Sequence, residues 1–328
     1  MTTPEPSPKV SVIIPTYNRA GLLPRAVNSV LAQSFQDFEL LIVDDCSADD
    51  TPQVIAAFAD PRIRALRHEM NRGLSAALNT GIANARGEFV AFLDDDDEFT
   101  PDSLADRLAA LEASPPETAM AYGWCDRVDE ASGEVIVSHR FTLEGAEAFE
   151  FSLRGSALGG DWSMLVRTSA ARDVGGFDER LSLGADALFQ CCLISKYGII
   201  HVPRIVALAH EQQGRSRIST ISNWDRMLEH HEIHRQRFSA EIDQRPGLRH
   251  YLARELPAHW MRLRAVYAIR QGAITLSLRS AVKAFTIHPL TTKNLRLPLH
   301  LLKGFLFYAT PLRRFRSHLQ RLLGQHKE

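Results

Sequence analysis

The sequence predicts an α/β protein whose mostly parallel sheet is flanked by helices, followed by a C-terminal helical region. From Lys9 to Leu93, short β-branched segments alternate with segments in which apolar residues recur at helical spacing. Polar or acidic residues directly follow three of the predicted strands, as at the ligand-binding edge of a parallel sheet. The 328 residues suffice for one large domain of this class and an appendage.

Four strands are expected in the N-terminal part of the chain, over residues 9–14, 38–43, 63–67 and 89–93. The last is a continuous apolar run, typical of a strand that is buried on both faces. Helices are expected between them, over residues 25–33, 51–58 and 73–85. Strict alternation of strand and helix favours right-handed crossovers, and therefore a parallel sheet.

The following segment has a less regular pattern. A strand over 120–124 and a second over 135–137, separated by Ser132-Gly133, predict a hairpin. A strand over 163–167, a helix over 187–197 and a last strand over 199–209 follow. None of the four cysteines has the CxxC or Cys/His spacing of a zinc site, and the two in the helix over 187–197 are expected in the core.

Four consecutive carboxylates, Asp94 to Asp97, follow the predicted strand over 89–93. Adjacent carboxylates repel and raise one another's pKa, which a bound cation relieves. A solvated acidic turn before a helix starting at Pro101-Asp102 explains the same residues equally well. The polar ends of two other predicted strands, residues 16–18 and 44–47, favour a shared site over three unrelated turns.

Four segments occur in an order that resembles the successive motifs of family 2 glycosyltransferases: residues 10–19, 40–47, 71–81 and 87–97. The resemblance covers about the first 215 residues. It implies a GT-A fold, which is a Rossmann-like sheet flanked by helices, and inverting transfer from a nucleotide sugar. We expect a disordered N-terminus over 1–8, a catalytic domain over 9–220 and a basic helical region over 221–328.

The resemblance assigns the metal-binding DxD element to Asp94 and Asp96. It implies that Asp96 is a ligand of Mn²⁺ or Mg²⁺ and that Asp94 contacts the ribose or the metal shell. Asp95 and Asp97 are expected to be bystanders, although Asp97 is close enough in sequence to join the metal shell.

The resemblance also implies a nucleotide pocket at the end of the first strand. Tyr17 and Asp45 match the positions that contact the base, and Pro15 and Thr16 line the same pocket. A carboxylate facing the ring N–H of uracil or guanine makes a charge-assisted hydrogen bond. A turn aromatic is the alternative interpretation for Tyr17.

Inverting transfer needs one carboxylate that takes the proton from the acceptor hydroxyl. The resemblance implies that Asp186, which matches the second acid of a Glu-Asp pair, is this base. Ala185 replaces the first acid, and Asp186 also suits the first turn of a helix. Asp161 and Trp162 are candidate acceptor contacts upstream.

The loop after the last predicted strand carries His210, Arg215 and Arg217. His210 is a candidate metal ligand, and the two arginines are candidate phosphate contacts. Leu78 stands where many relatives have arginine, which removes one phosphate contact that the resemblance would supply. Ser216 stands where the Gln-x-x-Arg-Trp element of processive synthases has tryptophan, so we expect a non-processive enzyme.

Charge is unevenly distributed along the chain. Residues 258–328 contain 13 lysines and arginines but one acid, Glu328, whereas the whole chain has a net charge of -1. A basic amphipathic tail favours attachment to an anionic membrane surface. The alternative is packing of the tail on the acidic catalytic domain. The aromatic spacing does not indicate nucleic-acid binding.

The sequence therefore predicts a cytoplasmic, metal-dependent hexosyltransferase, peripheral on the inner face of the membrane. Residues 1–8 lack the apolar core of a signal peptide, and no apolar run reaches the roughly 18 residues of a spanning helix. A UDP-sugar is the favoured donor and a glycan or lipid-linked hydroxyl the acceptor, in cell-envelope or surface polysaccharide synthesis. The alternative is a non-catalytic nucleotide-sugar-binding protein or partner subunit.

Overall fold

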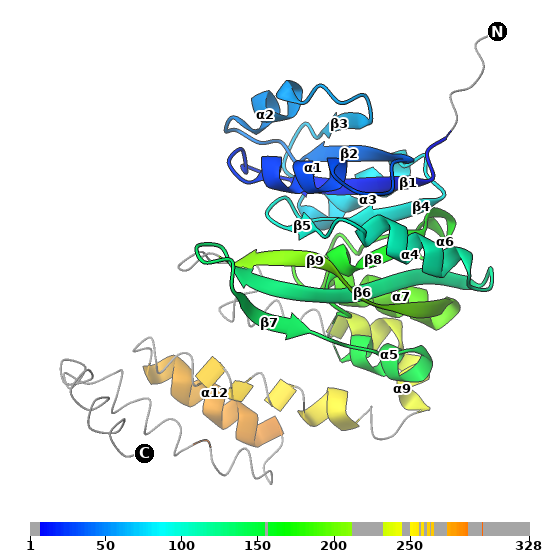
Figure 1. Cartoon of the computed structure of the whole chain (residues 1–328). Helices are drawn as coiled ribbons and strands as arrows, with labels where there is room; N and C mark the ends of the chain where they lie inside the picture. The colour runs from blue at the N-terminus through cyan, green and yellow to red at the C-terminus, as the bar shows by residue number, and fades with distance from the viewer. Residues whose placement is uncertain are drawn as a thin grey trace, which may run out of the picture. The chain divides into compact units, whose positions relative to one another are not determined.

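The computed structural model describes residues 7–154, 157–211, 232–244, 250–255, 257–258, 261–262, 264–265, 274–287 and 297. The chain divides into two compact units, Met1–Arg217 and Ile218–Glu328. The described strands all belong to the first unit (Figure 1). This unit also carries the candidate functional residues discussed below.

The first unit is built on a nine-stranded sheet with the order β3-β2-β1-β4-β8-β6-β9-β5, and β7 pairs with β6. Its parallel part consists of β1 (Val10–Thr16), β2 (Phe38–Asp44), β3 (Ile63–Arg67) and β4 (Phe89–Phe92). Every residue of β1, β2 and β4 is buried, as expected for strands covered on both faces.

The rest of the sheet is mixed. It comprises β5 (Glu98–Phe99), β6 (Thr118–Asp129), β7 (Val135–His139), β8 (Met164–Arg167) and β9 (Gly198–Glu211). β8 runs antiparallel between β4 and β6, whereas β9 runs parallel to β6. β5 pairs with β9, so the chain that leaves β4 crosses to the far edge of the sheet within a few residues.

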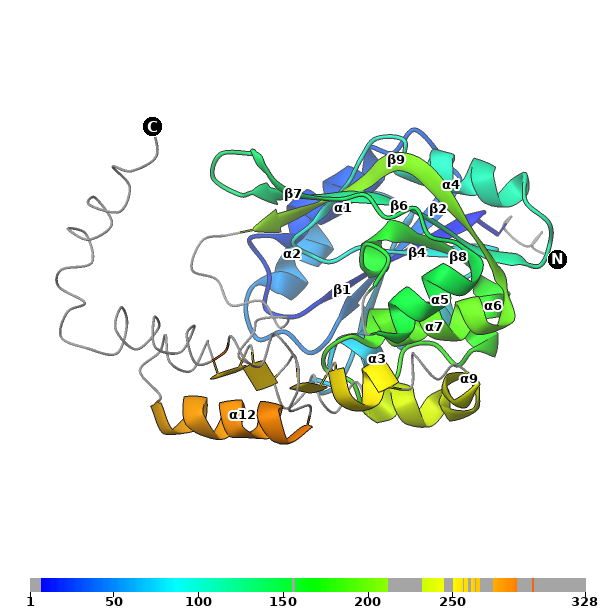
Figure 2. The same ribbon diagram turned by 90° about the horizontal axis from the view of Figure 1, so that it is seen from below.

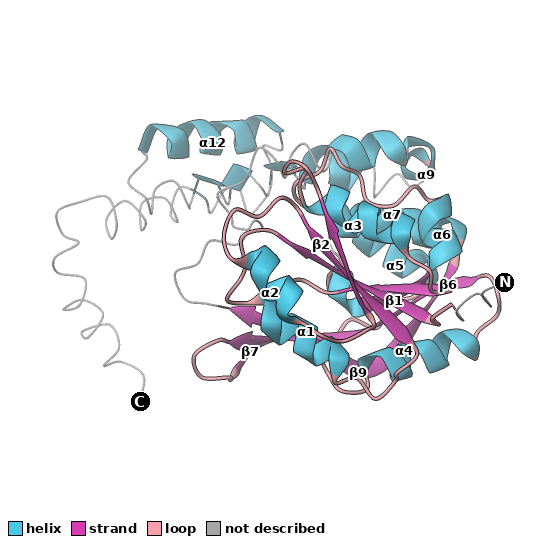
Figure 3. Ribbon diagram, turned by 90° about the horizontal axis from the view of Figure 1, so that it is seen from above, coloured by secondary structure: helices cyan, strands magenta, loops and turns pink. Residues whose placement is uncertain are grey.

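Helices cover both faces of this sheet (Figures 2 and 3). On one face lie α1 (Leu23–Leu31), α2 (Thr51–Ala57) and α4 (Ser103–Glu112). On the other lie α3 (Leu74–Asn84), α5 (Gly145–Leu153), α6 (Thr168–Asp173) and α7 (Ala185–Lys196). The second unit contains α9 (Ser239–Asp243), a π-helical turn (Tyr251–Glu255) and α12 (Ile274–Ile287).

Three aromatic rings hold the α7 side of the sheet. Phe92 of β4 meets Phe177 edge to face at 5.2 Å, and Phe189 of α7 stacks on Phe177 with ring centroids 4.3 Å apart. Such arrangements add to the free energy of burial by about 0.5–1.5 kcal/mol per pair. They fix the segment before α7 against the end of β4, where the acidic cluster begins.

The expected strands and helices of the first unit are confirmed, with ends shifted by a few residues. The short strand β5, the helices α5 and α6 and the 3₁₀ turn Asp161–Ser163 were not expected. The helical region expected over 221–328 contains α12. Residues 221–231 and 298–328 of this region lie outside the described residues, as do parts of 245–296. Within the described part of the chain, no helix combines the length and apolarity needed to span a membrane.

Candidate functional site

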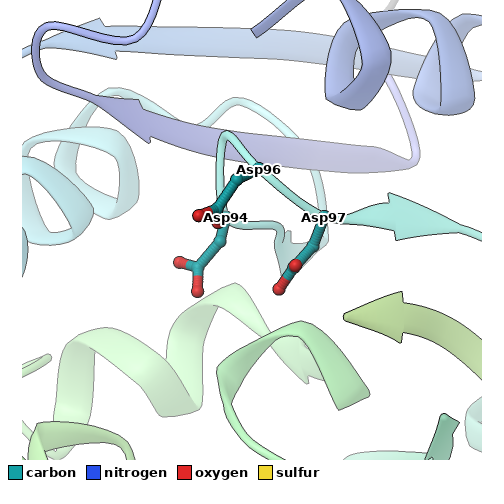
Figure 4. Close-up of side chains that lie close together, drawn as sticks. All are labelled: Asp94, Asp96 and Asp97. Atoms are coloured by element: carbon teal, nitrogen blue, oxygen red, sulfur yellow. The ribbon is translucent and has the colours of Figure 1, made fainter. Parts of the chain in front are cut away.

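A loop of four aspartates connects β4 to β5. Leu93 continues the β4 ladder by donating its N–H to the carbonyl of Ile13, at 3.0 Å. The chain then turns, because the N–H of Asp97 donates to the carbonyl of Asp94 at 3.2 Å. The turn brings carboxylate oxygens of Asp94, Asp96 and Asp97 within 4.8 Å of one another (Figure 4). Asp94 and Asp96 were the predicted DxD pair, and Asp97 joins them in this cluster.

Burial and like charges strongly perturb the first aspartate of this cluster. Burial raises the pKa of Asp94 well above its usual range, and the charges of Asp161, Asp97, Asp96 and Asp95 raise that pKa further. Protonation or a cation would each relieve this repulsion. Three carboxylates that converge in this way are hard oxygen donors, which are the ligands that Mg²⁺ and Mn²⁺ prefer.

Asp95 turns to the end of β1 and is not part of the cluster. Its Oδ2 accepts a 2.6 Å hydrogen bond from the hydroxyl of Thr16, and Arg19 Nε lies 3.9 Å from its Oδ1. Burial raises the pKa of Asp95 to about 7, although the Thr16 hydroxyl opposes this shift. Asp95 therefore joins the acidic loop to the loop that follows β1.

The loops after β1 and β2 are joined to each other. Asn18 and Cys46 adopt positive φ angles of 53° and 67°, which are uncommon for residues other than glycine. The Asn18 amide oxygen accepts from the N–H of Ala48 at 2.7 Å, and Ser47 Oγ accepts from the N–H of Asn18 at 2.9 Å. Because of these bonds, the two strand ends form one rigid rim.

Tyr17 is an exposed aromatic residue of this rim. Its side chain is 45% exposed, while Pro15 and Thr16 are buried in β1. An aromatic ring at the end of a parallel strand offers a flat face to a ligand that binds there.

Asp45 accepts hydrogen bonds on both carboxylate oxygens. Its Oδ1 lies 2.6 Å from His68 Nδ1 and accepts from the N–H of Arg72 at 2.8 Å, and its Oδ2 accepts from the N–H of Gly73 at 2.7 Å. The buried side chain thus holds the start of α3 against the end of β2. Asp44 binds Arg67 and the N–H of Ser47 instead, and so supports the same loop.

Asp161 begins a 3₁₀ turn, Asp161–Ser163, that lies beside the acidic cluster. Gly160 precedes it with φ 88°, a backbone conformation that side chains rarely adopt. The fully buried Arg107 of α4 donates to the carbonyls of Trp162 and Met164 at 3.3 and 2.7 Å, and these bonds hold the turn against α4. Burial, together with the charge of Asp186, raises the pKa of Asp161 to about 7.

Asp186 lies in the first turn of α7. Gly184, with φ 73°, is the residue at which the chain enters the helix, and Ala185 is the first helical residue. Burial raises the pKa of Asp186, although the N–H of Ala187 donates to its Oδ1 at 2.9 Å and opposes the shift. Since Asp161 interacts with both Asp186 and Asp94, the predicted base and the acidic cluster belong to one partly buried acidic region.

His210 lies near the end of β9 and contacts three acids. Its N–H donates to Asp97 Oδ1 at 2.9 Å. Its ring nitrogens face Glu98 Oε2 at 2.8 Å and Glu130 Oε2 at 3.3 Å. The predicted role of His210 as a metal ligand stays a prediction. The other two residues predicted in this loop, Arg215 and Arg217, lie outside the described residues.

Two residues of the site were not predicted. Arg25 of α1 donates to both carboxylate oxygens of Glu130 and to the carbonyl of Asp96. The sequence holds no local signal for this pair, since 105 residues separate Arg25 from Glu130.

Leu78, which replaces an expected arginine, is buried in α3 and faces the core.

Comparison with known proteins identifies the family. The family model described as "Glycosyl transferase family 2" matches residues 11–181, slightly more than half of the chain. Among curated proteins, the succinoglycan biosynthesis protein ExoO of Rhizobium meliloti is 27% identical over 306 residues, which cover 89% of this chain and 85% of ExoO.

Solved structures show the same fold. TarS 1-349 of S. aureus in complex with UDP-GlcNAc superposes with a TM-score of 0.56 and 19% identity, covering 87% of this chain and 93% of that one. The mannosyltransferase PcManGT from Pyrobaculum calidifontis, in complex with GDP-Man and Mn²⁺, superposes with a TM-score of 0.57 and 18% identity, covering 98% and 88%. The expected GT-A fold is confirmed. The chain belongs to glycosyl transferase family 2.

Proposed function

We propose that this chain is an inverting, non-processive glycosyltransferase that moves one sugar from a nucleotide-diphosphate sugar, with a UDP-sugar favoured, to a hydroxyl acceptor. The observation that carries the proposal is the convergence of Asp94, Asp96 and Asp97 at the end of β4. This cluster lies next to the rim formed by the β1 and β2 ends, and Asp161 connects it electrostatically to Asp186. The residues proposed to bind the metal, the nucleotide and the acceptor therefore lie at one edge of the sheet.

Asp96, with Asp94 and Asp97 beside it, would hold Mn²⁺ or Mg²⁺. The donor set fits such a cation, since its three carboxylate oxygens lie within 4.8 Å of one another. When bound, the metal would neutralise the charge that grows on the diphosphate as the sugar leaves. His210 is a further candidate ligand, as predicted from the sequence. PcManGT, which shares the fold, was solved with Mn²⁺.

The nucleotide is proposed to bind along the β1 rim. The exposed ring of Tyr17 would cover the base, with Pro15 and Thr16 beneath it and Asp94 reaching the ribose. Asp45 Oδ2 accepts one hydrogen bond among the described residues, from Gly73, and a carboxylate oxygen has two lone pairs. The second lone pair would accept the ring N–H of uracil. Arg215 and Arg217 are proposed as phosphate contacts.

Asp186 is proposed as the catalytic base. Inversion requires a single displacement, in which the base takes the proton of the acceptor hydroxyl on the face opposite the leaving diphosphate. A carboxylate in water is a weak base, and the burial that raises the pKa of Asp186 makes it a better one. Asp161 and Trp162, which the Arg107 contacts hold in place, would contact the acceptor.

The acceptor is proposed to be a growing glycan or a lipid-linked glycan of the cell envelope. ExoO, the relative that this chain matches over most of its length, is named for succinoglycan biosynthesis. The basic residues over 258–328 would hold the enzyme on the anionic inner face of the membrane, in the cytoplasm.

The test is release of free nucleoside diphosphate from a panel of UDP-, GDP- and dTDP-sugars in the presence of Mn²⁺. We expect slow hydrolysis of one donor by the wild type, and its loss in both Asp96→Ala and Asp186→Asn. Absence of metal-dependent binding of every donor by the folded protein would contradict the proposal. If a donor binds but neither water nor a panel of glycan and lipid-linked acceptors takes its sugar, the non-catalytic alternative, which Ala185 permits, replaces it.

A further inference from the structure

Arg25 connects three parts of the site through one guanidinium group. Its Nη1 donates to Glu130 Oε1 and Oε2 at 2.6 and 2.7 Å, and its Nη2 donates to the main-chain carbonyl of Asp96. The side chains of Arg25 and Glu130 are 21% and 29% exposed, so solvent screens this ion pair only partly. Arginine suits this place because its planar fork can serve two acceptors in fixed directions.

Glu130 extends this contact to the other side of the acidic loop. Its N–H donates to the carbonyl of Glu211 at 2.9 Å, which ties it to the end of β9. Its Oε2 lies 3.3 Å from His210 Nδ1, and the N–H of His210 donates to Asp97 Oδ1. The acidic loop is therefore held at Asp96 from α1 and at Asp97 from β9, and Glu130 joins the two supports.

We propose that Arg25 is a positioning residue for the metal-binding loop, and that Glu130 orients its guanidinium. This inference rests on the proposed function of the loop. Four adjacent carboxylates repel one another, and the loop needs fixed contacts to keep three of them converged before a cation arrives. Arg25 binds the main-chain carbonyl of Asp96 and not its carboxylate, so this contact does not compete with a cation for the carboxylate oxygens of the cluster. Outer contacts of this kind commonly change metal affinity without changing the ligands.

The test is Mn²⁺ binding without donor or acceptor, measured from the electron paramagnetic resonance signal of free Mn²⁺, alongside urea unfolding. In Arg25→Met and Glu130→Gln we expect the dissociation constant for Mn²⁺ to rise about 10- to 100-fold, the usual effect of losing an outer contact of a metal site. Arg25→Lys, which keeps the charge but cannot reach both acceptors, is expected to weaken Mn²⁺ binding while staying close to wild type in stability.

Arg62→Met is the matched control. Arg62 also makes two hydrogen bonds to one carboxylate, that of Asp60, with similar exposures of 25% and 23%, but none of its described contacts reaches the acidic loop. Wild-type Mn²⁺ affinity in folded Arg25→Lys and Glu130→Gln would overturn the inference. Weakening in Arg62→Met as large as in Arg25→Met would also overturn it, in favour of general destabilisation. Failure of the wild type itself to bind Mn²⁺ would contradict the proposed function of the loop, and the inference with it.

Discussion

The main-chain N–H of His210 donates a 2.9 Å hydrogen bond to Asp97 Oδ1, although 113 residues separate the two. β9 reaches this position because it runs parallel to β6 over its whole length, with His210 opposite Val128. The bond holds one carboxylate of the acidic cluster from the mixed part of the sheet, while β4 supplies the cluster from the parallel part. The candidate metal site is therefore assembled where the two parts of the sheet meet.

Replacement of Asp186 by asparagine tests its proposed role as the base. Asparagine keeps an oxygen for the N–H of Ala187 but cannot take a proton, so the helix start should stay intact. We expect kcat to fall about 10²- to 10⁴-fold while the Kd of the donor stays unchanged. Steady-state kinetics and calorimetric donor binding measure the two quantities. Asp173→Asn, an exposed carboxylate at the end of α6, is the control and should leave both unchanged.

Gly160 is expected to be essential for placing Asp161 and Trp162. A Cβ at this position would lie 2.7 Å from Trp162 Cζ2, in addition to the strain of φ 88°. We expect Gly160→Ala to destabilise the protein by about 1–3 kcal/mol and to lower transfer to the acceptor more than donor hydrolysis. Urea unfolding and the ratio of transfer to hydrolysis check this.

Gly133→Ala provides the comparison for that variant. Gly133 has φ 70°, but a Cβ there would meet nothing within 4 Å. The two variants therefore share backbone strain and differ in crowding against Trp162. Equal transfer-to-hydrolysis ratios in the two variants would argue against a role for the Asp161–Ser163 turn in holding the acceptor.

Much of the parallel part of the fold was predictable from local sequence. The strand Phe38–Asp44 is apolar except for Glu39 and ends in an acid, and the carboxyl ends of parallel strands share an edge. Asp94 and Asp96 were placed at one site on this ground and by the family motif. The antiparallel insertion of β8 between β4 and β6 was not predictable, since strand order depends on contacts distant in sequence.

The different orientations of the four aspartate side chains could likewise not be predicted from the local sequence. Asp95 turns to Thr16, while Asp97 joins the cluster, because a turn closed by Asp94 and Asp97 directs neighbouring side chains to different sides. A run of identical residues gives no indication of where such a turn falls. Arg25 was hidden for a related reason: on a predicted helix it resembles any exposed arginine, and its partner Glu130 lies far away in sequence.

Asp45 is expected to serve both stability and donor binding. Asp45→Asn replaces one carboxylate oxygen by an NH₂ group, which cannot accept a hydrogen bond. The variant therefore loses the acceptor either of the Gly73 N–H, at Oδ2, or of the Arg72 N–H, which shares Oδ1 with His68. Leaving one buried donor unpaired should cost about 1–3 kcal/mol of unfolding free energy. We also expect weaker binding of UDP. If the variant binds UDP with normal affinity, the role of Asp45 is limited to supporting the start of α3.

Asp161 gives a pH dependence with a defined sign. Burial and the charge of Asp186 raise its pKa from 3.8 to about 7, so the folded protein keeps a proton that the unfolded chain releases. Its contribution to stability is therefore fully present below about pH 4 and is lost as the pH rises to about 7. Among the described residues, Asp94 and Asp186 interact electrostatically with Asp161, and ionisation of either one raises the pKa of Asp161 further.

The measurement is the difference in unfolding free energy between wild type and Asp161→Asn from pH 4.5 to 8, in EDTA to exclude metals. Asparagine is neutral at every pH, so we expect this difference to fall as the pH rises to about 7 and then to level off. Asp60→Asn is the control: the Arg62 guanidinium lowers the pKa of Asp60, so its titration falls below the measured range and its difference should be flat. A flat difference for Asp161→Asn as well would mean that its carboxyl group is already ionised at pH 4.5. A hydrogen-bond donor or a cationic group of the protein would then have to stabilise that charge.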